Sequence, residues 1–298
     1  GVNPYTIDFP DIYQGTSHTY TSGMLSGART NFGYCYMPVT LALALPGHLL
    51  GDYRYAHIAA LALAAVLMAY AHPSRIGMLV AAVFLFTPRA FYFIEQGWTD
   101  AITILLLSAT VFVAIRWPRG VAWLLGVFLA SKQYLPFMLP AVVLLLPAGW
   151  RWRDLWSVLW KAAAVALLLT LPMALWNLRG FIDNAALLQF KAPFRTDALS
   201  FLAWLANAGG PELPSVVGFA ALDPAAVLAL RRAPRGPAGF AAAVAVIYFV
   251  FFGFNKQAFC NYYFFVLAGL CTAVAGLAGG AARASAMPVG AIPVSSRT

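Results

Sequence analysis

The sequence predicts an all-α fold: a polytopic transmembrane helix bundle with interfacial or re-entrant helices on the outer face of the membrane. Hydrophobic residues make up 62% of the 298 residues and charged residues 10%, whereas soluble domains are roughly 45–50% apolar and about 25% charged. Several apolar runs also approach the roughly 20 residues that a bilayer crossing needs. The basic residues fall in short loops between these runs rather than along one stripe, so nucleic acid is not an expected partner.

Residues 1–36 are polar and rich in Tyr, Thr and Gly, and we expect an exposed outer loop that carries Asp8 and Asp11. The sequence begins at Gly1, without Met and without a hydrophobic segment ahead of this loop. It therefore reads as an N-terminally incomplete protein, or as one that lacks a first membrane helix. Residues 37–50, MPVTLALALPGHLL, are apolar but short and contain Pro46, which favours an interfacial or re-entrant helix over a full crossing.

The helical membrane domain is predicted to span residues 37–280. Its full crossings are expected at 53–71, 76–90, 98–116, 155–177, 237–254 and 258–280. Residues 120–147 predict a hairpin of two short helices with Lys132 at its tip. Residues 213–230 predict a segment broken at Asp223-Pro224, because Asp caps a helix and Pro suits its first turn. The small, Pro-containing and aperiodic residues 281–298 predict a disordered tail.

The charges set the expected orientation. The loops RWPRG (116–120), RWRD (151–154) and RRAPR (231–235) are nearly pure Arg, which places them on the cytoplasmic side. The opposite side then holds charges of both signs and every acidic residue except Asp154 and Asp223. A structural loop has no need of such a mixture, so we expect the chemistry on that outer face.

The most informative segment is FNKQAFCNYYFF, residues 254–265, where Lys256, Gln257, Asn261 and Tyr262 stand at the mouth of the last crossing. A sugar needs amide hydrogen bonds and aromatic stacking, and a phosphate needs a cation. These residues are therefore expected to bind substrate. The alternative is an aromatic belt with a Lys that extends to the interface.

Three further segments are expected to line the same site. EQGWTD provides Glu95, Gln96 and Asp100, although Asp100 would also suit a helix N-terminus with Thr99 as its cap. ASKQYLP provides Lys132 and Gln133, although Lys132 would also suit the membrane interface. The loop after Trp176 predicts a helix on the membrane surface at 180–190, followed by Arg195, which suits a phosphate or a lipid headgroup but also an ordinary surface anchor.

From these segments we expect Glu95, Asp100, Lys132, Arg195 and Lys256 to lie at one membrane face around one cavity. We also expect Lys256, with either Lys132 or Arg195, to neutralise a phosphate. Metal spacing is absent among the four His residues, and the phosphate-binding and protease motifs are absent too, so no metal or cofactor is expected. The three Cys residues leave open a disulfide between Cys35 and Cys260 or three free thiols.

Taken in order, the segments GVNPY, YCYMPVTLALALPG, EQGWTDAITILLLSA, SKQYLPFMLP, FKAPFRTDALSF and NKQAFCNYYFF resemble the GT-C membrane glycosyltransferases. The resemblance covers about residues 1–265 and is nearest to the bacterial polyprenyl-phosphate-mannose-dependent mannosyltransferases. It implies a multi-pass protein of the bacterial inner membrane. It also implies an inverting transfer of a sugar from a polyprenyl-phosphate donor to a lipid or glycan acceptor on the non-cytoplasmic face.

The resemblance also implies that an acidic residue of the first outer loop acts as general base. Asp8 and Asp11, in DFPD, are the candidates in this sequence. The family's acid lies closer to the first helix, before the NPY-like element, so the base is alternatively upstream of Gly1. Two other functional classes remain open. A lipid or solute transporter would need a continuous polar path through the membrane, and a membrane scaffold would have no need of converging polar clusters.

Overall fold

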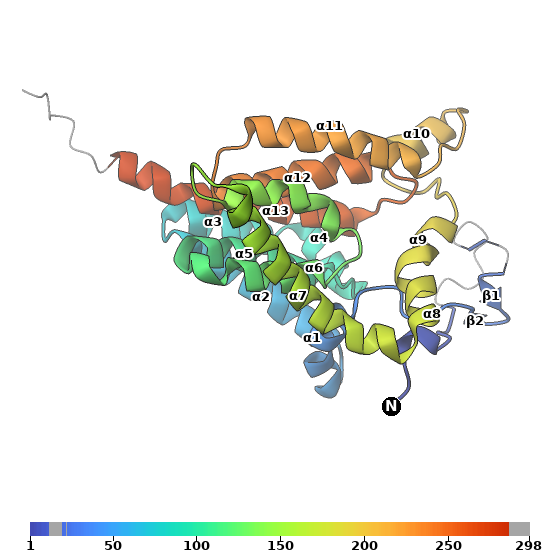
Figure 1. Ribbon diagram of the computed structural model, residues 1–298. Helices are drawn as coiled ribbons and strands as arrows, with labels where there is room; N and C mark the ends of the chain where they lie inside the picture. The colour runs from blue at the N-terminus through green and yellow to red at the C-terminus, as the bar shows by residue number, and fades with distance from the viewer. Residues whose placement is uncertain (12–19, 22, 286–298) are drawn as a thin grey trace, which may run out of the picture.

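The computed structural model describes residues 1–11, 20, 21 and 23–285 and is built almost entirely of helices. Figure 1 shows the longer helices gathered in one bundle, with the N-terminal segment and α8–α9 at one end of it. The N-terminal segment contains a 3₁₀ turn, η1 (Pro4–Thr6), and an antiparallel hairpin of β1 (Leu25–Ser26) and β2 (Arg29–Thr30). The predicted all-α fold is confirmed.

The helices of the first half follow in chain order. They are α1 (Pro38–Leu49), α2 (Arg54–Ala71), α3 (Arg75–Leu85), α4 (Pro88–Glu95), α5 (Asp100–Arg116), the 3₁₀ turn η2 (Pro118–Gly120), α6 (Val121–Leu129) and the 3₁₀ helix η3 (Leu135–Leu145). The second half contains α7 (Trp152–Trp176), α8 (Leu178–Phe181), the π-helical η4 (Ile182–Leu187), α9 (Leu188–Lys191), α10 (Phe201–Asn207), α11 (Val216–Arg232), α12 (Pro237–Gly253) and α13 (Cys260–Ser285).

Three single helices, α2, α7 and α13, are long and apolar enough to cross a membrane, and the bent pair α3–α4 would make a fourth span. The crossings predicted at 98–116 and 237–254 are present as α5 and α12, of 17 residues each. At 1.5 Å per residue each is about 25 Å long, slightly short of the roughly 30 Å hydrocarbon core. Together these helices make the chain a multi-pass membrane protein.

Two predicted elements differ from the structure, and each contains a proline. The crossing predicted at 76–90 is two helices, α3 and α4, bent by 48° at Phe86–Thr87, because Pro88 starts a new helix. The break predicted at Asp223-Pro224 is absent, since α11 continues through Pro224. Residues on both sides of Pro224, including Leu222 and Ala225, are buried, and this packing offsets the hydrogen bond that proline cannot donate. Asp223 is therefore an exposed helical residue and not a cap.

The other expected segments are partly confirmed by the structure. The hairpin predicted at 120–147 is present as α6 and η3, with Lys132 in the turn between them. Helical structure occupies the predicted surface segment 180–190 as α8, η4 and α9. Helix α13 runs to Ser285, five residues into the predicted tail at 281–298, and residues 286–298 lie outside the described residues. Cys35, Cys260 and Cys271 are free thiols.

The core centres on α12 and α13, which pack side by side (Figure 1). Small residues allow this approach. A Cβ on Gly269 would lie 3.1 Å from the Ala245 Cβ, and one on Gly276 would lie 3.2 Å from the Ala238 Cβ. Close contact through small residues is a common way for membrane helices to associate. This close packing of α12 and α13 fixes the position of the turn that connects them, residues 254–259.

The two ends of the bundle differ in chemistry. The Gly236 amide donates to the Leu144 carbonyl, so the Arg-rich turn at 231–235 lies at the far end of η3 from Lys132. Likewise, Arg116 ends α5 while Asp100 begins it, which separates them by about 24 Å along the helix. Lys132 is therefore at the end opposite the Arg-rich turns, as the charge pattern predicts.

Candidate functional site

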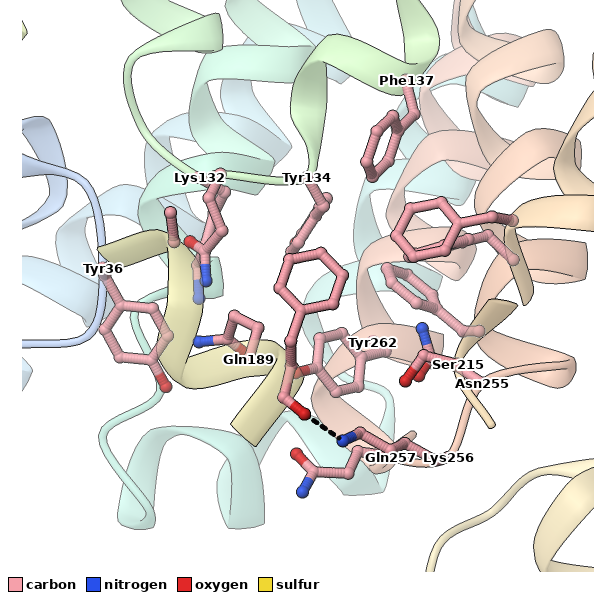
Figure 2. A pocket seen from close by; sticks show the side chains of 16 residues that line it. Tyr36, Lys132, Tyr134, Phe137, Gln189, Ser215, Asn255, Lys256, Gln257 and Tyr262 are labelled. Atoms are coloured by element: carbon pink, nitrogen blue, oxygen red, sulfur yellow. Dashed lines mark hydrogen bonds between the residues drawn. The ribbon is translucent and has the colours of Figure 1, made fainter. Parts of the chain in front are cut away.

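A cavity of about 190 Å³ lies where the α6–η3 turn, the α12–α13 turn and helix α9 meet. Figure 2 shows its side chains, with Lys132 and Lys256 on different sides and Tyr134 and Tyr262 between them. Half of its lining residues are aromatic, namely Tyr36, Tyr134, Phe137, Phe190, Phe219, Phe251, Phe252 and Tyr262. Its polar lining residues are Lys132, Gln133, Gln189, Ser215, Asn255, Lys256 and Gln257.

On one side of the cavity, Lys132 forms a buried ion pair. Its Nζ lies 3.3 Å from Asp100 Oδ2, and the two side chains are 2% and 1% exposed. Nζ also lies 3.8 Å from the centre of the Tyr36 ring, within cation–π range. Two other donors complete the pair, since Asn261 Nδ2 lies 2.9 Å from Asp100 Oδ2 and the Tyr134 hydroxyl lies 3.1 Å from Asp100 Oδ1. The positive charge of Lys132 is thus compensated within the protein.

Helix ends position this pair. Asp100 is the first residue of α5, Asn261 is the second residue of α13, and Lys132 follows the end of α6. A carboxylate at a helix N-terminus faces unpaired amide groups and a favourable dipole. Thr99 occupies the cap position of α5 as predicted, but its side chain makes no capping hydrogen bond.

On the other side, Lys256 is held by backbone carbonyls. Its Nζ donates to the Phe190 oxygen at 3.0 Å and also to the Ala192 oxygen, both at the end of α9. The neighbouring Gln257 donates through Nε2 to the Pro193 oxygen at 2.9 Å. Among the described residues, no carboxylate forms a salt bridge with Lys256. Partial burial lowers the pKa of Lys256 below its ordinary value.

The segment that follows α9 is attached to the same turn. The Arg195 amide donates to the Lys256 oxygen at 3.2 Å, and the Leu199 amide donates to the Ala258 oxygen at 2.7 Å. The Tyr263 hydroxyl donates back to the Leu199 oxygen. These bonds hold residues 195–199 against the α12–α13 turn that carries Lys256.

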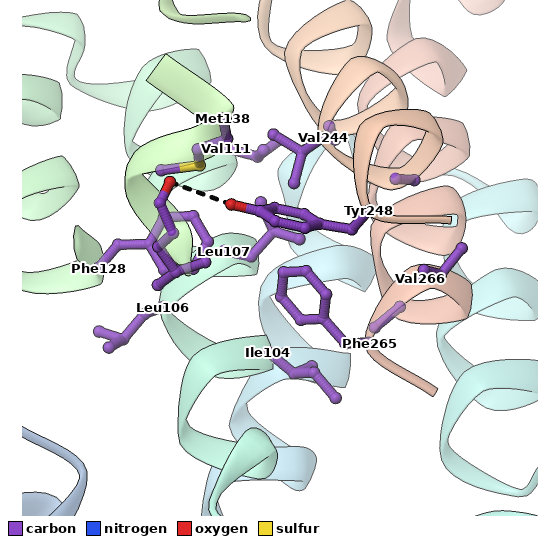
Figure 3. Close-up of a cluster of buried hydrophobic side chains, with 14 of the residues drawn as sticks. Ile104, Leu106, Leu107, Val111, Phe128, Met138, Val244, Tyr248, Phe265 and Val266 are labelled. Carbon is purple, nitrogen blue, oxygen red and sulfur yellow. Dashed lines mark hydrogen bonds between the residues drawn. The ribbon is translucent and has the colours of Figure 1, made fainter. Parts of the chain in front are cut away.

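Tyr248 of α12 forms hydrogen bonds with the backbone just after Lys132 and Gln133. Its hydroxyl lies 3.0 Å from both the Tyr134 and the Leu135 carbonyl oxygens, at the start of η3. Figure 3 shows the ring of Tyr248 among apolar side chains of several helices, including Leu107, Phe128 and Phe265. This contact anchors the turn that carries Lys132 and Gln133 to the core helix α12.

The structure brings together most of the predicted site residues. Lys132, Gln133, Lys256, Gln257 and Tyr262 line the cavity. Asp100 is not a lining residue, but it accepts hydrogen bonds from Lys132 and from Asn261.

Three other predicted binding residues lie elsewhere. Glu95 and Gln96 are exposed at the end of α4, where the positive φ of Gly97, 64°, turns the chain before α5 begins. Arg195 pairs with Asp197 at 2.6 Å and stacks on the Phe259 ring at 4.8 Å. Its charge is therefore also compensated, and it does not line the cavity.

The predicted base candidates also lie outside the cavity lining. Asp8 is exposed, and its carbonyl accepts a hydrogen bond from Arg29. Asp11 accepts a hydrogen bond from the Tyr20 hydroxyl at 2.7 Å. A bridge between Pro10 and Arg29 attaches this stretch of backbone to the β1–β2 hairpin.

Sequence reasoning missed Tyr36, Gln189, Ser215 and Asn255, which also line the cavity. Asn255 adjoins Lys256, and that adjacency was a usable signal. Tyr36 and Gln189 reach the cavity because chain segments far apart in sequence fold back over it, and no local pattern reveals that. Among the described residues, no group of three or more His, Cys, Asp and Glu side chains is placed to hold a metal ion.

Comparisons with known proteins bear on the fold. No family model matches the sequence, and no curated protein matches it. The chain is similar in structure to ArnT from Cupriavidus metallidurans, solved with undecaprenyl phosphate bound, with a TM-score of 0.56 and 19% sequence identity. The match covers 83% of this chain and 50% of that one, so this chain spans about half the length of ArnT. The chain thus shares its fold with the matched part of that protein.

Proposed function

We propose that the protein transfers a sugar from a polyprenyl-phosphate-linked donor to a hydroxyl-bearing lipid or glycan acceptor on the non-cytoplasmic face. The observation that carries the proposal is the uneven compensation of the cations near the cavity. Lys132 is paired with Asp100 and Arg195 with Asp197, whereas Lys256 lines the cavity with carbonyl partners alone. A carbonyl orients an ammonium group without cancelling its charge, so Lys256 retains an attraction for an anion.

The lining suits the headgroup of such a donor. Aromatic rings provide stacking faces, and the amides of Gln133, Asn255 and Gln257 provide hydrogen-bonding groups for hydroxyls. The volume of about 190 Å³ lies below the roughly 300–1,000 Å³ of typical small-molecule sites. In the proposal this small cavity takes only the headgroup, and the polyprenyl chain lies in the surrounding membrane. The likeness to ArnT, solved with undecaprenyl phosphate, supports a lipid of this class.

In the proposed reaction, the acceptor oxygen forms a bond to the anomeric carbon as the bond from that carbon to the phosphate oxygen breaks. The phosphate leaves with the electron pair, and the hydroxyl proton passes to a base. Lys256 stabilises the negative charge that grows on the departing phosphate. Asp100 keeps Lys132 in place. Both of its carboxylate oxygens accept hydrogen bonds, Oδ2 from Lys132 and Asn261 and Oδ1 from Tyr134.

The test is turnover by the purified protein reconstituted in lipid with an undecaprenyl-phosphate-linked hexose. The products measured are free undecaprenyl phosphate and the glycosylated acceptor. Lys256→Met is expected to lower the rate by about a hundredfold or more, the usual effect of removing one group that stabilises transition-state charge. Lys161→Met, on α7 beside Trp160, is the matched control and keeps the wild-type rate. Equal rates for wild type and Lys256→Met, or no product from wild type, would contradict the proposal.

A further inference from the structure

One polar atom of the cavity wall has no partner. Gln133 lines the cavity, and its Oε1 is buried without a hydrogen bond from any described residue. A buried polar atom without a partner is unfavourable by itself, and native proteins satisfy most such atoms. An unpartnered acceptor on a residue that lines a cavity therefore points to a donor that arrives with the ligand.

The orientation of the Gln133 amide follows from its other end. Its Nε2 lies 3.5 Å from the Cys35 carbonyl oxygen, a weak contact that still distinguishes the two ends of the amide. Reversing the amide would bring two oxygens together, with no hydrogen between them. The unpartnered atom is thus the oxygen, which accepts hydrogen bonds and cannot donate them.

This chemistry excludes a phosphate as the partner of Gln133 Oε1. The phosphate of a polyprenyl-phosphate sugar is a diester that carries oxygens and no proton at neutral pH, so it accepts hydrogen bonds. Its attractive partners are donors such as Lys256. A sugar ring, in contrast, carries hydroxyl groups that donate. Gln133 also follows Lys132, which Figure 2 shows on the side of the cavity away from Lys256, so a phosphate at Lys256 leaves the Gln133 side for the sugar.

We propose that Gln133 accepts a hydrogen bond from a hydroxyl of the donor sugar and so distinguishes the sugar-charged lipid from the bare polyprenyl phosphate. This inference rests on the proposed function and adds a specificity residue to it. Discrimination of this kind matters because the bare lipid is the product of the reaction and carries the same phosphate. A site that holds an acceptor for a substrate hydroxyl disfavours the analogue without it, since the buried oxygen then stays unpaired.

The experiment measures the affinity of the purified protein in lipid nanodiscs for undecaprenyl phosphate and for undecaprenyl-phosphate-linked hexose. Gln133→Met keeps the length of the side chain and removes the acceptor. It is expected to weaken binding of the sugar-charged lipid by about tenfold and to leave binding of the bare lipid within about twofold. Gln133→Glu, which keeps an acceptor oxygen, retains the preference for the sugar-charged lipid even if both affinities fall. Gln96→Met, on the exposed end of α4, is the control.

The ratio of the two affinities is the deciding quantity, because a general disturbance of the fold lowers both together. An unchanged ratio in Gln133→Met overturns the inference, whether both affinities stay the same or both fall equally. Failure of the wild-type protein to bind either lipid would instead overturn the proposed function. These two failures are therefore distinguishable.

Discussion

The cavity has two Lys-Gln pairs, and the same dipeptide has different surroundings on the two sides. In both pairs the Gln amide nitrogen contacts a backbone carbonyl, that of Cys35 for Gln133 and that of Pro193 for Gln257. The lysines differ. Lys132 is almost fully buried against a carboxylate, whereas Lys256 is partly exposed and bound to carbonyl oxygens. The comparison indicates that Lys132 maintains the shape of the site while Lys256 provides its available positive charge.

The largest expected difference between the two sides is in stability. Lys132→Met leaves the Asp100 carboxylate buried without its cation, and breaking a buried pair in this way typically costs about 3–5 kcal/mol. Lys256→Met removes no carboxylate partner, so we expect it to lower the free energy of unfolding by no more than about 1 kcal/mol. Unfolding in mixed micelles, followed by tryptophan fluorescence, measures both.

The double variant Asp100→Asn with Lys132→Met sharpens this contrast. Removing both charges leaves neither uncompensated, so the double variant is expected to recover at least half of the stability that Lys132→Met loses. Equal destabilisation by Lys132→Met and Lys256→Met would remove the basis of the comparison.

A second stability effect is confined to the Lys132 side. Tyr248→Phe removes the hydroxyl that contacts the Tyr134 and Leu135 carbonyls, and buried carbonyls without a donor cost about 1–3 kcal/mol. The measurement is the same unfolding experiment, combined with undecaprenyl phosphate binding. A loss of stability with unchanged binding is expected. A loss of binding at full stability would mean that the two sides are not independent.

The third prediction concerns pH and the Lys256 side. Burial lowers the pKa of Lys256, so its charge is present below that pKa and is lost as the pH rises through it. An anion binds the charged form, and its affinity is therefore expected to fall with rising pH, by up to about tenfold per unit above the pKa. Lys256→Arg should remove this decline below about pH 11, because the guanidinium stays charged. Titration of undecaprenyl phosphate binding between pH 7 and 10.5 provides the measurement, and an identical decline in both proteins would assign it to another group.

The smallest expected effect concerns the outer loop. Asp8→Asn and Asp11→Asn should each change the transfer rate by less than about twofold, because both residues lie outside the cavity lining and belong to the hairpin region. Turnover of the reconstituted protein measures this. A large loss of turnover with normal donor binding in either variant would show that the hairpin moves over the cavity and supplies the base.

The sequence predicts most of the fold but only part of the site, and the physical reasons differ. Long apolar runs predict most of the membrane helices, and polar residues beside such runs point to Lys132, Gln133, Lys256 and Gln257. The sequence does not reveal which charges pair. Asp100 is 32 residues from Lys132 and 161 residues from Asn261, so their contact depends on how several helices assemble.

The differences between the expected and the observed placement of residues have the same origin. Glu95 and Gln96 were grouped with Asp100 because they are neighbours in the chain, yet the turn at Gly97 separates them from the cavity. Pro224 was expected to end a helix on local propensity alone, whereas burial on both sides of it maintains the helix. Local preference is a weak guide where tertiary packing opposes it.

The most direct test of the central claim is the affinity for undecaprenyl phosphate of four purified proteins in lipid nanodiscs. They are the wild type, Lys256→Met, the Asp100→Asn and Lys132→Met double variant, and the control Lys161→Met. If Lys256 provides the available charge, Lys256→Met binds about tenfold to a hundredfold more weakly, and the other two variants remain within a few-fold of wild type. Wild-type affinity in Lys256→Met, together with a large loss in the double variant, would contradict the account and assign the phosphate to Lys132.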